Sequence, residues 1–131
     1  NCDAIVDAAV KTFGRVDILV VASGQNKVSK IVDQKPEDFL DVMDANVTQS
    51  WLIARAAGRQ MLKQGQGGKV ILMSSARGLL GHPAGYTAYC ASKGGIRMMM
   101  RNLAMELAPH KINCNNIAPG AIAHPVLSIS S

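Results

Sequence analysis

Short apolar runs alternate along this chain with longer segments whose apolar residues recur at helical spacing. The apolar runs are residues 16–22, 69–73 and 112–118. The helical segments are residues 1–13, 37–61 and 86–108. A near-continuous apolar run predicts a strand that is buried on both faces, as in a parallel sheet. Strands that alternate with helices therefore predict an α/β, Rossmann-like doubly wound parallel sheet.

The helix predicted over 37–61 is apolar on more than one side. Pro36 and two acids open it, which suits the positive end of a helix. One face carries Leu40, Met43, Val47, Trp51 and Ala54, and another carries Phe39, Val42, Ile53 and Ala57. The sheet would cover one face, and a second copy of the chain would cover the other. This predicts a homodimer or homotetramer packed through 37–61 and 86–108; a helix wedged inside a larger monomer is the alternative.

Length and charge change this picture little. The 131 residues suit one domain with one core. The formal net charge is +5, but the lysines and arginines are scattered along the chain without aromatic residues between them, which argues against a nucleic-acid groove. No apolar run approaches the ~20 residues of a membrane span, and we recognise no signal peptide. We expect a soluble protein without nucleic-acid or membrane partners.

The cysteines and histidines predict neither a disulfide framework nor a metal site. The three cysteines are Cys2, Cys90 and Cys114. They are odd in number and widely spaced, which suits a reducing cytoplasm. The three histidines, His82, His110 and His124, show no ligand spacing.

The candidate chemistry lies between the second apolar run and the last predicted helix. Ser74 and Ser75 end the run, a Gly/Pro-rich loop follows, and Tyr89 precedes Lys93 by four residues. Residues at i and i+4 of a helix share one face, so the two side chains point into the same space. A nearby ammonium stabilises a phenolate, which suits Tyr89 to general acid–base work. An ordinary buried tyrosine beside a solvated lysine is the alternative.

This constellation resembles the Ser, Tyr-x-x-x-Lys centre of the short-chain dehydrogenase/reductase family. Counted back from the glycine at position 78, Ser75 is the better match to the family serine, with Ser74 as runner-up. Ser75 lies fourteen residues before Tyr89, and one extra residue fits in the 82–86 loop. Tyr86 fails the pattern because position 90 is a cysteine. The resemblance implies that Tyr89 passes a proton while Lys93 assists it and holds the nicotinamide ribose. Ser75 would orient the substrate oxygen.

Two further features follow from this resemblance. Asn46, within the predicted helix 37–61, stands where relatives complete a catalytic tetrad through a local helix distortion; an incidental polar residue is the alternative. The turn Val21-Ala22-Ser23-Gly24 stands where relatives carry Asn-Asn-Ala-Gly near the cofactor. Its small residues allow close backbone approach.

Asn115-Asn116-Ile117-Ala118-Pro119-Gly120 resembles the family's Asn-x-Ile/Val-x-Pro-Gly. The resemblance implies cofactor contacts at Ala22, Gly24, Tyr89, Lys93, Pro119, Gly120 and Ile122, with NAD or NADP as cofactor. His124 stands where relatives carry threonine.

The resemblance places residues 1–131 within one partial domain. A Gly-rich cofactor turn does not precede Asn1, and a C-terminal substrate segment does not follow Ser131, so we expect part of a longer protein. The implied activity is NAD(P)(H)-dependent interconversion of an alcohol and a carbonyl in a small-molecule substrate. The alternative is a non-catalytic relative that serves as an assembly or binding module.

Overall fold

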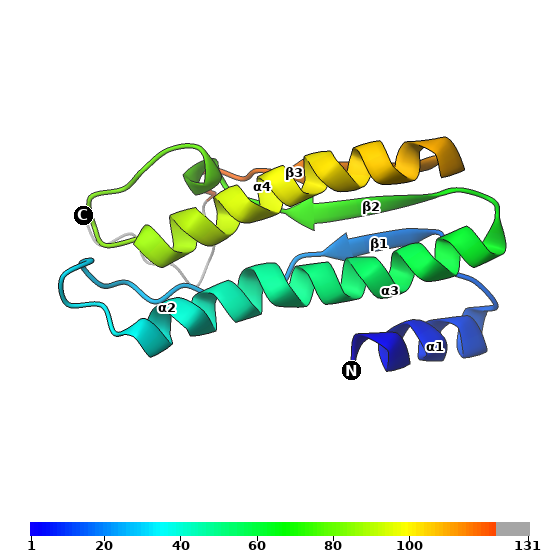
Figure 1. Ribbon diagram of the computed structural model, residues 1–131, viewed down its shortest axis with the longest axis horizontal. Helices are drawn as coiled ribbons and strands as arrows, with labels where there is room; N and C mark the ends of the chain where they lie inside the picture. Colours follow the sequence, from blue (N-terminus) through cyan, green and yellow to red (C-terminus); the bar gives the residue numbers. More distant parts are fainter. Residues whose placement is uncertain (123–131) are drawn as a thin grey trace.

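Three parallel strands and a layer of helices make up the computed structural model, which describes residues 1–122 (Figure 1). The main elements are α1 (Cys2–Phe13), β1 (Ile18–Val21), α2 (Pro36–Met43), a π-helical turn (Asp44–Thr48), α3 (Gln49–Gln64), β2 (Gly68–Met73), α4 (Thr87–Leu107) and β3 (Ile112–Ile117). Short 3₁₀ turns lie at Ala76–Gly78 and Ala108–His110. The α/β class and the parallel sheet predicted from the hydrophobic pattern are confirmed.

The sheet has the order β1-β2-β3, and each neighbouring pair is parallel. Val21 pairs with Leu72 and Leu72 pairs with Asn116, so the three strands end at one edge. Successive strands are added in one direction across the sheet. Right-handed crossovers in one direction place their helices on the same face, and α3 and α4 lie together on one side of the strands (Figure 1).

Within residues 1–122, only this helical face of the sheet is covered. Val70 and Leu72 point into the helical layer and are 1% and 0% exposed. On the opposite face Ile18 and Val20 are 62% and 56% exposed. The prediction of burial on both faces is therefore met on one face within the described part of the chain.

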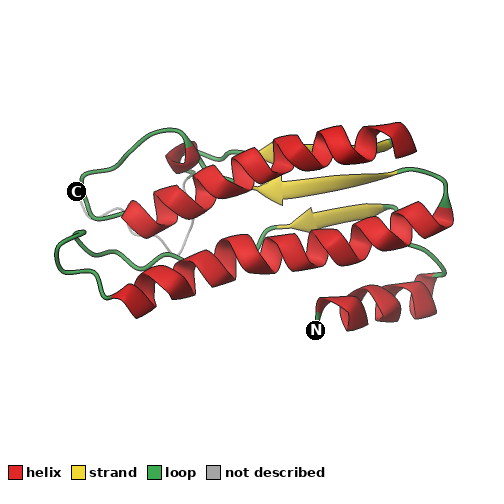
Figure 2. Cartoon of the chain, viewed as in Figure 1, coloured by secondary structure: helices red, strands yellow, loops and turns green. Residues whose placement is uncertain are grey.

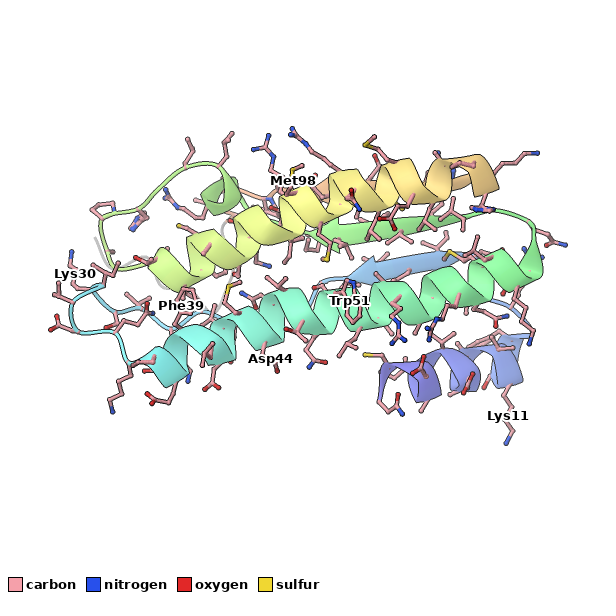
Figure 3. The ribbon with its side chains drawn as sticks, viewed as in Figure 1. Lys11, Lys30, Phe39, Asp44, Trp51 and Met98 are labelled. Atoms are coloured by element: carbon pink, nitrogen blue, oxygen red, sulfur yellow. The ribbon has the colours of Figure 1, made fainter. Side chains whose placement is uncertain are left out.

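The long helical segment runs without a break from α2 through the π-helical turn into α3 (Figure 2). The face of α3 that packs on the sheet carries the small side chains of Ala54 and Ala57, which let α3 approach the sheet closely. Its other apolar face stays open, with Leu40 and Trp51 63% and 47% exposed. Figure 3 shows Trp51 on α3 and Met98, which is 62% exposed, on α4.

Candidate active site

A cleft of about 830 Å³ lies at the edge where the strands end. Its lining residues are Ala22, Ser23, Gly24, Gln25, Asn26, Met73, Ser74, Tyr86, Tyr89, Lys93 and Gly120. They come from the turn after β1, the ends of β2 and β3, and the first turns of α4. The carboxyl end of a parallel sheet is where open α/β folds bind ligands.

Tyr89 and Lys93 lie one turn apart on α4 and both line this cleft. Lys93 Nζ is 5.6 Å from the centroid of the Tyr89 ring. The Lys93 side chain is anchored, because Nζ donates a 2.9 Å hydrogen bond to the Met73 carbonyl at the end of β2. The residue is only 4% exposed, and this burial lowers the pKa of its ammonium from the ordinary value of 10.5. The helical spacing of Tyr89 and Lys93 thus brings both side chains to the same cleft, as predicted.

Asn46 lies inside the π-helical turn and is 0% exposed. Its Nδ2 donates to the Gln25 carbonyl at 2.9 Å and to Ser92 Oγ at 2.8 Å, while its Oδ1 accepts from the Gln25 amide at 2.7 Å. Single π-turns inside helices occur often at functional sites. The side chain ties the turn after β1 to α4 and so holds two walls of the cleft together.

The carbonyl of Asn46 accepts a 2.6 Å hydrogen bond from the Ser50 hydroxyl, four residues later. A carbonyl oxygen has two lone pairs and can accept more than one hydrogen bond. The π-helical turn is the local distortion expected around Asn46, and within it the Asn46 carbonyl accepts the Ser50 hydroxyl.

The two serines after β2 differ in what their hydroxyls do. Ser74 lines the cleft and is 4% exposed, and its Oγ donates to the Lys93 carbonyl at 3.0 Å. Ser75 is not among the lining residues, and its Oγ accepts from the Arg77 amide at 3.1 Å, capping a 3₁₀ turn. The hydroxyl proton of Ser74 is thus donated to the Lys93 carbonyl, whereas that of Ser75 has no acceptor among residues 1–122.

The predicted cofactor residues divide into two groups. Ala22, Gly24 and Gly120 line the cleft together with Tyr89 and Lys93. Pro119 is not among the lining residues, and its carbonyl accepts a 2.9 Å bond from the Ala76 amide. Ile122 is 70% exposed and also lies outside the lining set. His124 lies outside the described residues.

Gly24 occupies a position where a side chain would crowd its neighbours. A Cβ atom built there would lie 3.0 Å from Asn46 Oδ1 and 3.2 Å from Lys93 Nζ. Such contacts are tighter than ordinary van der Waals separations. The glycine therefore lets the turn after β1 approach the polar groups of the site directly.

Tyr86 is a lining residue that the sequence pattern set aside. Its ring packs edge-on against the ring of Tyr89, with centroids 6.1 Å apart and an interplanar angle of 76°. Its ring also stacks on that of His82 at 4.5 Å and 22°. The Gly/Pro-rich composition of the loop predicted a turn here, but nothing in local sequence indicated that the turn directs Tyr86 into the cleft.

The sequence predicted neither a metal site nor a disulfide framework. Over residues 1–122, no group of three or more His, Cys, Asp or Glu side chains is placed to hold a metal ion. Cys2, Cys90 and Cys114 are all free thiols. In that range no helix combines the length and the apolarity that crossing a bilayer requires.

Comparison with known proteins decides the family. The family model described as short chain dehydrogenase matches residues 1–129. The chain belongs to this family. The resemblance carried by Tyr89, Lys93 and the preceding serines is therefore confirmed at the level of the family, which is one of oxidoreductases.

Individual short-chain dehydrogenases agree with this assignment. An uncharacterized oxidoreductase of Mycobacterium tuberculosis (strain ATCC 25618 / H37Rv) is 52% identical over 119 residues, which cover 91% of this chain and 44% of the relative. The L-rhamnose 1-dehydrogenase (NAD(P)(+)) of Azotobacter vinelandii is 36% identical over 121 residues, covering 92% and 47%.

The fold comparison gives the same result. The crystal structure of a short-chain type dehydrogenase/reductase from Mycobacterium marinum superposes with a TM-score of 0.89 at 35% identity, over 91% of this chain and 49% of that structure. The chain thus spans about half the length of the short-chain dehydrogenases that it matches.

Proposed function

We propose that the protein containing this chain is an NAD(P)(H)-dependent dehydrogenase or reductase that interconverts an alcohol and a carbonyl. The observation that carries this proposal is the anchored, buried ammonium of Lys93 beside the ring of Tyr89, in a cleft at the carboxyl ends of the strands. The name of the A. vinelandii relative, an L-rhamnose 1-dehydrogenase (NAD(P)(+)), supports both the reaction type and the cofactor class.

The residues present fit a nicotinamide cofactor. The glycine at position 24 leaves room where a Cβ would crowd Asn46 and Lys93, so the backbone and the ammonium can both approach a ribose closely. Ala22, Gly24, Lys93 and Gly120 would hold the cofactor, and Pro119 and Ile122 would extend that contact beyond β3. When bound, the nicotinamide supplies the hydride chemistry. NAD and NADP both satisfy this description.

The side chains supply the proton chemistry. The Tyr89 hydroxyl gives its proton to the carbonyl oxygen during reduction, and the Tyr89 phenolate takes the proton back from the alcohol during oxidation. The Lys93 ammonium stabilises the phenolate that remains on Tyr89 after reduction. Burial lowers the pKa of Lys93, which eases release of a proton from its ammonium toward Tyr89. Asn46 holds the turn after β1 against α4 through Gln25 and Ser92, and its carbonyl would receive a relay water beside the Ser50 bond.

Ser75 is the residue that we assign to orient the substrate oxygen. Its Oγ accepts a bond from the Arg77 amide, and among the described residues its hydroxyl proton is left to donate. The Ser74 hydroxyl proton is already donated to the Lys93 carbonyl, so Ser74 holds α4 in place instead. Replacing Ser75 with alanine would then raise KM or lower kcat, while replacing Ser74 would mainly lower stability.

The test uses the whole protein and Tyr89→Phe. This change removes the hydroxyl but keeps the ring, so kcat should fall about 100-fold or more while NADH or NADPH still binds. Binding is followed by nicotinamide fluorescence, and turnover by nicotinamide absorbance over a panel of alcohols. Cys90→Ala, one residue along α4, is the matched control and keeps wild-type turnover. Wild-type turnover in Tyr89→Phe would refute the assignment.

A wild-type protein that binds neither nucleotide would favour the alternative of a non-catalytic assembly or binding module. The absence of both family asparagines in the turn 21–24 is the feature that favours it. Retention of the Tyr89–Lys93 pair at the cleft argues for the enzyme.

Two further proposals concern context. The apolar outer faces of the long helices, with Trp51 47% and Met98 62% exposed, would pack against a second copy of the protein. Sedimentation of the whole protein at the mass of a dimer or tetramer would support this packing, and sedimentation at the mass of a monomer would contradict it. The free cysteines suit a reducing compartment, so we assign the protein to the cytoplasm.

A further inference from the structure

We propose that Tyr86 is a specificity-determining residue that selects uncharged alcohols and ketones with a rigid apolar ring. This inference rests on the proposed function, because it concerns the substrate of the same cleft. It deepens that function by naming the wall against which the substrate packs and the class of substrate that the wall favours.

Tyr86 lies beside the proposed acid–base group. Its ring centroid is 6.1 Å from that of Tyr89, and both rings line the cleft. A substrate whose oxygen reaches the Tyr89 hydroxyl therefore places its carbon skeleton within reach of Tyr86. One face of the Tyr86 ring is already covered by His82 at 4.5 Å, so the remaining ring surface is what the cleft presents.

The loop that carries Tyr86 is held in place from outside the cleft. The Ser29 amide donates to the Gly85 carbonyl at 3.0 Å, and Lys30 Nζ donates to the Pro83 carbonyl at 2.5 Å. Figure 3 shows Lys30 on the loop that precedes α2. Gly85 has a φ of +83°, and a Cβ there would lie 2.5 Å from the Ser29 carbonyl carbon. Only glycine fits at this contact between the two loops. The contact fixes the backbone directly before Tyr86, which lies at the start of α4.

His82 is held as well. Its Nδ1 accepts a 3.2 Å bond from the Ala84 amide, which orients the imidazole ring under Tyr86. Tyr86 is thus backed by an oriented ring and preceded by an anchored glycine. A side chain ordered before binding loses little conformational entropy when substrate packs on it, so its contact contributes more fully to affinity.

The charge of the cleft indicates which substrates this wall favours. Among the described residues that line it, Lys93 carries the one formal charge, and Lys93 is occupied with Met73 and Tyr89. None of those residues offers a second cation to bind a carboxylate or phosphate. A flat aromatic wall next to the reacting oxygen instead favours a substrate with a rigid apolar ring. Such a ring packs against Tyr86 without fixing rotatable bonds, so it loses little conformational entropy on binding.

The experiment compares two uncharged alcohols of six carbons, cyclohexanol and hexan-2-ol, using the whole protein with its nicotinamide cofactor. Tyr86→Leu removes the ring and Tyr86→Phe keeps it. The ratio of kcat/KM for cyclohexanol to that for hexan-2-ol should fall about fivefold in Tyr86→Leu and stay near wild type in Tyr86→Phe. Circular dichroism and nicotinamide binding establish that each variant is folded.

The His82→Ala variant tests the support under the ring. It should lower the same ratio by a smaller factor, and it should have no further effect when combined with Tyr86→Leu, because His82 acts through Tyr86. An additive double variant would contradict this coupling.

Equal loss for both alcohols in Tyr86→Leu, or no loss for either, would overturn the inference and leave the proposed function intact. A wild type that turns over hexan-2-ol but not cyclohexanol would overturn it too. If the wild type turns over neither, the inference also fails. In that case the nucleotide titration decides whether the proposed function fails with it.

Discussion

Replacing Asn46 with alanine removes three hydrogen bonds from the interior of the site. The amide of Asn46 bonds both the N–H and the C=O of Gln25 and also the Ser92 hydroxyl, and the residue is 0% exposed. Each bond contributes about 1 kcal/mol net, and alanine returns about 0.5 kcal/mol through better helix propensity. We therefore expect Asn46→Ala to lower the free energy of unfolding by about 2.5 kcal/mol.

The assay is urea unfolding of the whole protein followed by circular dichroism, with the free energy of unfolding taken from the midpoint and slope. Asn102→Ala is the matched control. Asn102 is an exposed residue of α4 that bonds Glu106, so its replacement should change stability by less than about 0.5 kcal/mol. Hydrogen exchange adds a local readout, because the Gln25 amide should lose protection in Asn46→Ala. Equal effects of the two variants, with Gln25 still protected, would refute the reasoning.

Two further predictions concern the same site. Gly24→Ala should lower the free energy of unfolding by about 1–3 kcal/mol and reduce nicotinamide affinity, because the new methyl group would press on Asn46 and Lys93. Gly81 has open space around it, so the control Gly81→Ala should be neutral. Urea midpoints and nucleotide titration compare the two variants, and equal effects would contradict the packing argument. Burial lowers the folded-state pKa of Lys93, so the unfolded state binds the extra proton and stability rises with pH between the folded pKa and 10.5. The free energy of unfolding of wild type minus that of Lys93→Met should therefore increase from pH 7 toward pH 10, and a flat difference would contradict it.

Much of the architecture could be read from the sequence because it depends on local periodicity. The apolar runs at 69–73 and 112–118 correspond to β2 and β3 within one residue at each end. Tyr89 and Lys93 share a face for the same reason, since four residues make one helical turn. The family followed from the order of these motifs along the chain, which is also a one-dimensional property.

The tertiary structure decided which groups meet. Asn46 bonds Gln25 and Ser92, which lie 21 and 46 residues away, and helix periodicity carries no information about partners at such separations. Tyr86 enters the cleft because Gly85 packs on Ser29, a contact between two loops that neither loop encodes alone.

The exposed face of the sheet also shows the difference between what the sequence predicts and what packing decides. Ile18 and Val20 have the sequence of a buried strand, yet they are 62% and 56% exposed in the described part of the chain. The chain by itself determined the periods of its helices and strands, the turn residues between them and the spacing of Tyr89 and Lys93. Folding decided the partners of Asn46, the aim of Tyr86 and the covered face of the sheet, because periodicity acts over a few residues whereas packing joins residues that are distant in sequence.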